Sequence, residues 1–85
     1  MKVIRQAGNT NGDCVIFWRL NLGAEIQYQV VLLNNRTEQT LKAYSMAIAD
    51  GDFGRKHLER AAQVKGMEVF KEACGFMGID IEKEE

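Results

Sequence analysis

The sequence predicts a small α+β domain, in which a mostly antiparallel sheet of three to four strands precedes a C-terminal helix. Residues 1–35 are rich in β-branched and aromatic side chains, whereas residues 55–77 are rich in Ala, Glu, Lys and Met. Strands followed by a helical stretch are typical of α+β domains. A chain of 85 residues has no room for repeated crossover helices, so antiparallel strands are expected. We expect one domain over residues 1–79 and an acidic tail over residues 80–85.

Three strands are predicted at residues 1–6, 14–22 and 26–33. Between the first two lies a polar cluster that contains Asn11-Gly12, a strong signal for a hairpin. The second strand alternates between two faces, one with Val15, Phe17, Arg19 and Asn21 and the other with Ile16, Trp18, Leu20 and Leu22. Alternation of this kind places successive side chains on opposite sides of a sheet.

Residues 36–50 fit either a helix or a strand. As a helix, the segment would be capped by Asn35, and Glu38 would complete a capping box. As a strand, it would follow a hairpin turn at Asn34–Thr37, because paired asparagines tolerate positive φ angles. Residue propensity favours the helix. The turn chemistry favours the strand, as does the need of the strand at 26–33 for a neighbour, and we expect the strand.

Residues 56–77 predict a helix, because apolar side chains recur at spacings of three and four. The residues on this side are Leu58, Ala61, Ala62, Met67, Val69, Phe70, Ala73, Cys74 and Met77. Gly66 interrupts the pattern at a cost of about 1 kcal/mol relative to Ala, so a bend or a break is expected there. Gly78 is expected to end the helix, with Ile79 packing back against it.

Composition indicates a cytoplasmic protein with no membrane segment. No apolar run approaches the roughly 20 residues that span a bilayer. The first residues, 1–6, lack the apolar region of a signal peptide. The two cysteines, Cys14 and Cys74, are expected to be buried thiols rather than a disulfide.

Charge is distributed unevenly along the chain. The net charge is −1, yet residues 80–85 carry four negative charges and one positive charge, a net of −3. Residues 1–79 therefore carry +2. A basic body with an acidic tail is typical of nucleic-acid-binding proteins whose tails compete with the ligand. It is equally typical of a solvated terminus that keeps a chain soluble.

No catalytic constellation is evident. His57 is the sole histidine, and a nucleophile pair would need one of the cysteines to fold beside it. Asp50 and Asp52 lack the further oxygen ligands of a calcium loop and are expected to serve as turn and N-cap residues. No phosphate-cradling glycine motif is present. We expect no enzyme, no metal and no cofactor, although a small enzyme stays as a third hypothesis.

Aromatic side chains next to basic ones suggest single-stranded nucleic acid as a partner. Aromatic faces stack bases while basic groups follow the phosphates. The candidate binding residues are Trp18, Arg19, Lys42, Tyr44, Phe53, Arg55 and Lys56. The last three lie in a polar turn expected at residues 50–56, a place suited to ligand contacts. The aromatics would equally serve as core residues of a small sheet. Arg19 is the more diagnostic residue, because an arginine in mid-strand is expected to face solvent or a ligand.

From residue 28 onwards the order of motifs resembles a family of phage replication-module proteins that bind single-stranded DNA. The matching segments are Tyr28-Gln29-Val30, the alternation over Leu41–Ile48, Asp50-Gly51-Asp52-Phe53-Gly54-Arg55, and Ala73-Cys74-Gly75-Phe76-Met77-Gly78-Ile79. This chain departs from the family by lacking one residue between Phe53 and Gly54, and residues 1–27 have no counterpart.

The resemblance implies an OB-like β-barrel with a helix, sequence-tolerant binding of single strands and no catalysis. It also implies that Arg55 and Lys56 meet backbone phosphate and that Tyr44 or Phe53 stacks bases.

A second hypothesis is a protein-interaction or inhibitory module, with a homodimer as one form. Such a module would use an exposed strand edge or the methionines of the helix, Met67 and Met77.

Overall fold

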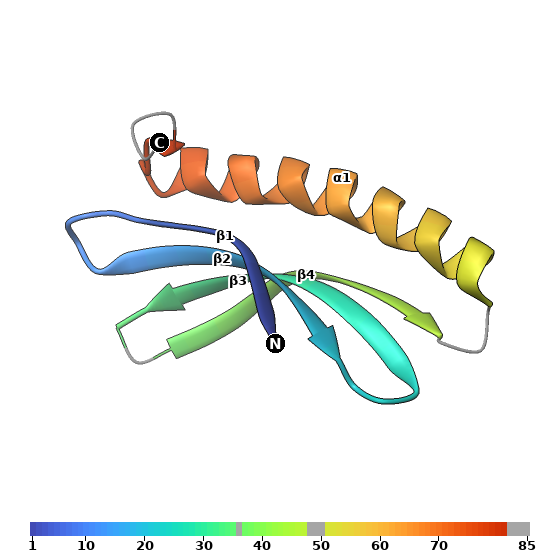
Figure 1. Ribbon diagram of the computed structural model, residues 1–85. Helices are drawn as coiled ribbons and strands as arrows, with labels where there is room; N and C mark the ends of the chain where they lie inside the picture. The colour runs from blue at the N-terminus through green and yellow to red at the C-terminus, as the bar shows by residue number, and fades with distance from the viewer. Residues whose placement is uncertain (36, 48–50, 82–85) are drawn as a thin grey trace.

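A four-stranded antiparallel sheet carries one long helix across one of its faces (Figure 1). The computed structural model describes residues 1–35, 37–47 and 51–81, with the backbone alone at residues 52 and 53. The strands are β1 (Lys2–Gly8), β2 (Asp13–Asn21), β3 (Glu25–Asn34) and β4 (Thr37–Ala47), and the helix is α1 (Asp52–Phe76). The predicted α+β class, with an antiparallel sheet and a C-terminal helix, is confirmed.

The sheet is an open meander in which each strand pairs with the next in the chain. The order is β1-β2-β3-β4, which makes β1 and β4 the edges within the described residues. The register shifts between Val3 and Arg5 on β1 and opposite Val30/Val31 on β4, and such bulges at edge strands discourage unwanted pairing. The OB-like barrel that the resemblance implies is therefore not confirmed.

The strand over Thr37–Ala47 resolves the segment that fitted either a helix or a strand. Asn35 adopts a positive φ of 53° in the turn between β3 and β4. The hydroxyl of Thr37 donates a hydrogen bond to the Asn34 carbonyl over 2.9 Å. Local turn chemistry and pairing along β3 together outweigh the helix propensity of the residues in this segment.

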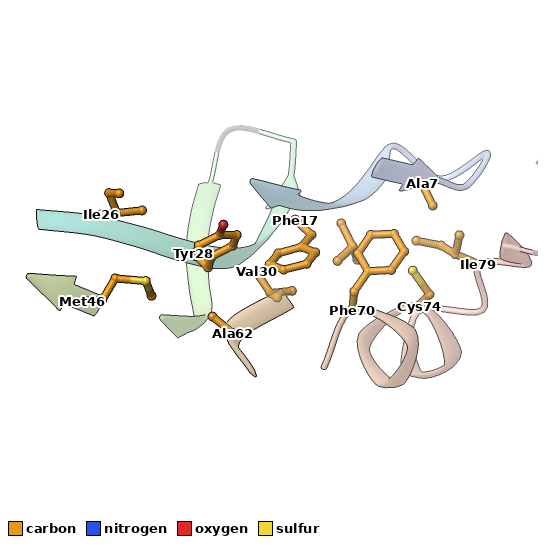
Figure 2. Close-up of a cluster of buried hydrophobic side chains, with 11 residues drawn as sticks. Ala7, Phe17, Ile26, Tyr28, Val30, Met46, Ala62, Phe70, Cys74 and Ile79 are labelled. Carbon is orange, nitrogen blue, oxygen red and sulfur yellow. The ribbon is translucent and has the colours of Figure 1, made fainter. Parts of the chain in front are cut away.

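The main core lies between α1 and the sheet face that it covers, as Figure 2 shows in close-up. The strands contribute Ala7, Val15, Phe17, Ile26, Tyr28, Val30 and Met46, and the C-terminal part of the chain contributes Ala62, Phe70, Cys74 and Ile79. Cys74 is buried as expected, whereas Cys14 is only half-buried. Met67 and Met77 are half-buried and pack against this cluster.

The opposite sheet face has a small apolar cluster of its own. Ile16 and Val31 are partners in the β2–β3 register and are 8% and 0% exposed. Their side chains alternate with those of Val15, Phe17 and Val30, which face α1, and they therefore point away from the helix. Among the described residues, no helix lies on this second face in Figure 1.

The helix is continuous and begins earlier than expected. Gly51 is its N-cap with a φ of 83°, and the Arg55 amide donates to the Gly51 carbonyl over 2.9 Å. Asp52 therefore lies in the first turn, and the expectation that it caps the helix is wrong. Asp50 lies outside the described residues. Residues 52–56 of the expected turn are helical, because Gly51, with its positive φ, begins the helix.

Gly66 does not break the helix, which is continuous over Asp52–Phe76, and it allows α1 to lie close to the sheet. A Cβ at this position would lie 2.5 Å from Cε1 of Phe17 and closer still to Cζ. Phe17 is fully buried, so its ring fills the space that a side chain would need. Helix propensity marks Gly66 as unfavourable, but the packing of α1 against Phe17 requires a residue without a side chain at this position.

The end of the helix follows the expected pattern. Gly78 has a φ of 69°, and the Ile79 amide donates to the Cys74 carbonyl over 2.8 Å. Ile79 is 6% exposed and packs back into the core, which confirms the predicted ending. Ile81 also packs against the core, and its carbonyl accepts a 3.4 Å hydrogen bond from Arg5 Nη2. This residue of the expected tail therefore packs against the domain. Residues 82–85 lie outside the described residues.

Candidate functional site

Arg19 faces the helix rather than a ligand. It lies on the same face of β2 as Phe17, and its Nε donates to Oε1 of Glu59 on α1 over 2.7 Å. That hydrogen bond raises the pKa of the guanidinium, against the opposing effect of burial. The expectation that a mid-strand arginine faces either solvent or a ligand is therefore wrong, because Arg19 pairs with a carboxylate of the same chain. The arginine is 30% exposed and is held by a carboxylate forty residues away.

Glu59 is the centre of a polar cluster that sequence analysis missed. Its Oε1 also accepts a 2.7 Å hydrogen bond from the Tyr28 hydroxyl, and Gln63 Nε2 donates to the same hydroxyl over 3.2 Å. Burial acts to raise the pKa of Glu59, but the hydrogen bonds from Tyr28 and Arg19 outweigh it, and the net pKa is lowered. Burial, and then the hydrogen bond to Glu59, raises the pKa of Tyr28. The cluster thus holds an ionised glutamate under a neutral, buried tyrosine.

Arg55 and Lys56 lie in the N-terminal part of α1 and have different surroundings. Arg55 Nε lies 3.8 Å from Oε2 of Glu59, and its side chain is 24% exposed. Lys56 is exposed and lines, with Glu59, Arg60 and Gln63, an open depression of about 320 Å³ on the flank of the helix. The i,i+4 spacing of Arg55 and Glu59 was the one sequence signal that could have pointed to this ion pair.

Lys42 and Tyr44 form a second group at the other flank of α1. Lys42 Nζ lies 5.9 Å from the centroid of the Tyr44 ring, a cation–π distance. Tyr44 is half-buried, and its ring lines a groove of about 130 Å³ between β4 and α1. The other residues that line the groove are Ser45, Met46, Leu58, Ala61, Ala62 and Lys65. Leu58 is 43% exposed and Lys65 is exposed, so an aromatic ring, an apolar wall and one amine line the groove, and Lys42 lies over the Tyr44 ring beside it.

Trp18 lies on the opposite sheet face. It pairs in register with Val3 and Gln29, and its indole N–H donates to Oε1 of Gln29 over 2.8 Å. Gln29 donates onward to Gln27, and Gln27 donates to Glu25. Trp18 is thereby tied into a chain of hydrogen-bonded side chains that ends at the Glu25 carboxylate, on the sheet face away from Tyr44 and Lys42.

The structure therefore divides the predicted site into three places. Arg19 and Arg55 meet at Glu59, with Lys56 beside them; Lys42 and Tyr44 meet at the β4 groove; Trp18 lies apart. The side chain of Phe53 lies outside the described residues. Leu58 and Lys65 complete the groove, and no sequence pattern places them beside β4, because that contact joins segments far apart in the chain.

The two halves of α1 differ in charge. Residues 52–65 have four basic and two acidic side chains, a net of +2, whereas residues 66–76 have one basic and two acidic side chains, a net of −1. Basic residues near a helix N-terminus oppose the helix dipole, so folding alone does not account for this arrangement. Both groups of basic residues flank the positive half.

Comparisons with known proteins and searches of the described residues for other kinds of site gave the following results. No family model, curated protein or solved structure matches the chain. The described residues include no group of three or more His, Cys, Asp or Glu side chains that could hold a metal ion. No helix in the described ranges combines the length and the apolarity that crossing a membrane requires.

Proposed function

We propose that this protein is a non-catalytic binding protein that holds single-stranded nucleic acid in the groove between β4 and the N-terminal half of α1. The observation that carries the proposal is the combination of the half-buried Tyr44 ring with two amines, Lys42 and Lys65, around one groove. A base that stacks on an aromatic face contributes about 1–3 kcal/mol, whatever its identity. Amines beside the ring attract the adjoining phosphates.

The charge of the helix supports a strand path along its N-terminal half. Lys56 is exposed on the same positive half of α1 as Lys65. Arg19 and Arg55 contribute less, because the Glu59 carboxylate neutralises part of their charge. Trp18 is not part of the proposed path, since it lies on the other sheet face.

The number of available amines predicts modest, salt-sensitive affinity. Two or three phosphate contacts give a slope of log affinity against log salt of roughly −1.4 to −2.1, since each contact to a single strand contributes about −0.7. Affinity should therefore fall roughly 7- to 18-fold between about 50 and about 200 mM salt. Fluorescence anisotropy of a labelled single-stranded oligonucleotide at both salt concentrations measures this slope.

Two substitutions separate the charge contribution from the stacking contribution. Lys42→Gln should reduce the salt slope by about 0.7, because one phosphate contact is lost. Tyr44→Leu should weaken binding by about tenfold and leave the slope unchanged, because an apolar side chain is kept but no base can stack. Lys71→Gln is the matched control, since Lys71 is an exposed lysine on the negative half of α1.

A flat titration of the wild-type protein at low salt would contradict the proposal. So would a loss in Lys71→Gln equal to that in Lys42→Gln, because binding would then depend on total charge and not on the groove.

A protein-interaction module is the second candidate, and the β4 edge favours it. β4 is an edge strand of 11 residues within the described sheet, and most of its side chains are exposed. Such an edge can accept an extended peptide as an added strand. If the oligonucleotide titration is flat, peptide binding at this edge becomes the leading hypothesis.

A further inference from the structure

The face of α1 that points away from the sheet exposes apolar side chains between charged ones. Val64 is 57% exposed and Phe76 is 93% exposed, and Ala61 and Gly75 lie on the same side of the helix. Residues at spacings of three and four share a face, and His57, Ala61, Val64, Glu68, Glu72 and Gly75 follow this spacing. Phe76 follows Glu72 at a spacing of four and lies at the edge of the face. Within the part of the chain that the structure describes, no strand or other helix lies against this side of α1 in Figure 1.

The two ends of this face have complementary shapes. Near the N-terminal end, His57, Arg60, Ala61, Val64 and Lys65 line a mostly apolar depression of about 310 Å³. Near the C-terminal end, the Phe76 ring projects almost wholly into solvent. Fifteen residues separate Ala61 and Phe76, which corresponds to about 22 Å along the helix.

We propose that a second copy of this chain packs antiparallel on this face of α1, so that Phe76 of each copy fills the depression of the other. A two-fold axis near residues 68 and 69 brings Phe76 of one copy opposite Ala61 of the second. The same register brings Lys65 opposite Glu72 of the second copy. One contact thus occurs twice, as an isologous interface requires.

Charge selects the antiparallel arrangement. Within α1, residues 52–65 carry +2 and residues 66–76 carry −1, so antiparallel pairing sets each positive half against a negative half. Parallel pairing would set like charges together along the whole helix. The small side chains at Ala61 and Gly75 let the two helix backbones approach closely, as small residues do in other helix pairs.

The size of the face sets the strength of the dimer. The helix of 25 residues is about 37 Å long, and a strip about 12 Å wide would bury roughly 900 Å² over both copies. That area is at the low end for specific interfaces, so the dimer dissociates readily on dilution. The nucleic-acid groove lies on the flank beside β4, and most of its lining stays outside this face.

Sedimentation velocity of the whole chain, from about 1 to about 500 µM, tests the dimer over the range expected for a small interface. The mass should rise from monomer towards dimer. Phe76→Ser and Val64→Glu should each weaken association by about tenfold or more, because they remove the projecting ring or place a charge in the depression. Both residues are exposed, so the fold should be kept, which circular dichroism verifies. Leu22→Ser is the matched control, since Leu22 is 52% exposed in the turn after β2.

A charge exchange tests the register. Lys65→Glu and Glu72→Lys should each weaken the dimer, and the double variant should restore it, because the two charges exchange places across the interface. A wild-type protein that stays monomeric throughout the range overturns the proposal. So does a dimer that survives both Phe76→Ser and Val64→Glu, because it must then form elsewhere, with the β4 edge as the next place to examine. Failure of the double variant to restore association overturns the antiparallel register.

Discussion

The C-terminal and N-terminal halves of α1 lie on the same sheet but are held by different contacts. In the C-terminal half, Phe70 and Cys74 are fully buried, and Gly66 admits the Phe17 ring directly beneath the helix. In the N-terminal half, Ala62 is buried but small, and the defined contact is the Glu59 carboxylate with Arg19 and Tyr28. Close apolar packing holds the C-terminal half against the sheet, and the charged cluster around Glu59 holds the N-terminal half.

This difference explains where the candidate groove lies. Beneath the C-terminal half, Phe70 and Cys74 pack closely against the sheet, whereas Leu58 in the other half and Tyr44 on β4 beside it are only partly covered. Regions with fewer buried apolar contacts open at lower free energy, and binding sites are drawn from them. The polar cluster keeps the N-terminal half in place without filling the groove between it and β4.

The largest effect is expected where packing alone holds the helix. Phe70→Ala should lower the free energy of unfolding by about 3–5 kcal/mol, because it leaves a cavity at the centre of the core. Phe76→Ala is the matched control and should change it by less than about 0.5 kcal/mol, since Phe76 is 93% exposed. Urea unfolding at low micromolar protein, followed by circular dichroism, compares the two. Equal losses would show that the core does not lie where the buried side chains place it.

A second, smaller effect is expected at Gly66. Gly66→Ala should destabilise by about 1–3 kcal/mol although alanine is the better helix former, because the new Cβ collides with the buried Phe17 ring. Urea unfolding of the single variant measures the loss. Adding Phe17→Leu should recover part of it if the ring is the cause. A gain in stability from Gly66→Ala alone would mean that α1 does not approach the sheet this closely.

The charged half should respond to substitution of one carboxylate. Glu59→Gln should cost about 1–2 kcal/mol near neutral pH, because Arg19 and Tyr28 lose a charged acceptor. Glu68→Gln is the control, since Glu68 is exposed on the outer side of α1. Chemical unfolding at neutral pH compares the two variants with the wild type.

The same carboxylate predicts a pH dependence of stability. The folded-state pKa of Glu59 is lowered, so its contribution is complete above the ordinary value of 4.5 and is lost as pH falls through the folded-state value. The pKa of Tyr28 is raised, so its contribution is complete below 10.0 and is lost as pH rises through the folded-state value. The free energy of unfolding measured from pH 2 to 11 should fall at both ends. Glu59→Gln should flatten the acid side, and an unchanged acid slope would place the responsible group elsewhere.

Local sequence patterns predicted the strands and the helix of this fold. They could not predict contacts between segments that are far apart in the chain. Alternation and turn residues predicted three strands, and the paired asparagines before Thr37 predicted the fourth against its helix propensity. The start of α1 was placed too late, because Gly51 begins it and neither Phe53 nor Gly54 is a strong helix former.

The candidate site shows the same limit more clearly. Arg19 was singled out as a residue that must face solvent or a ligand, and its partner Glu59 lies forty residues further along the chain. Gly66 was taken as a weak point, because the ring that requires it belongs to Phe17 on a separate strand. In both cases the residue was correctly identified as unusual, but its partner depends on how α1 crosses the sheet.

The smallest effect is expected at Gly75, and it separates the two roles of glycine in this helix. Gly75 is exposed, and a Cβ there would meet nothing within 4 Å. Gly75→Ala should therefore stabilise the monomer by about 0.5–1 kcal/mol, because alanine loses less backbone entropy in a helix. Thermal unfolding at low micromolar protein measures this gain, and sedimentation at high concentration measures association of the same variant. A methyl group at this position would hold the two helices of the proposed dimer further apart, so a more stable monomer should form a weaker dimer. A variant that gains stability and associates as tightly as the wild type would remove Gly75 from the contact.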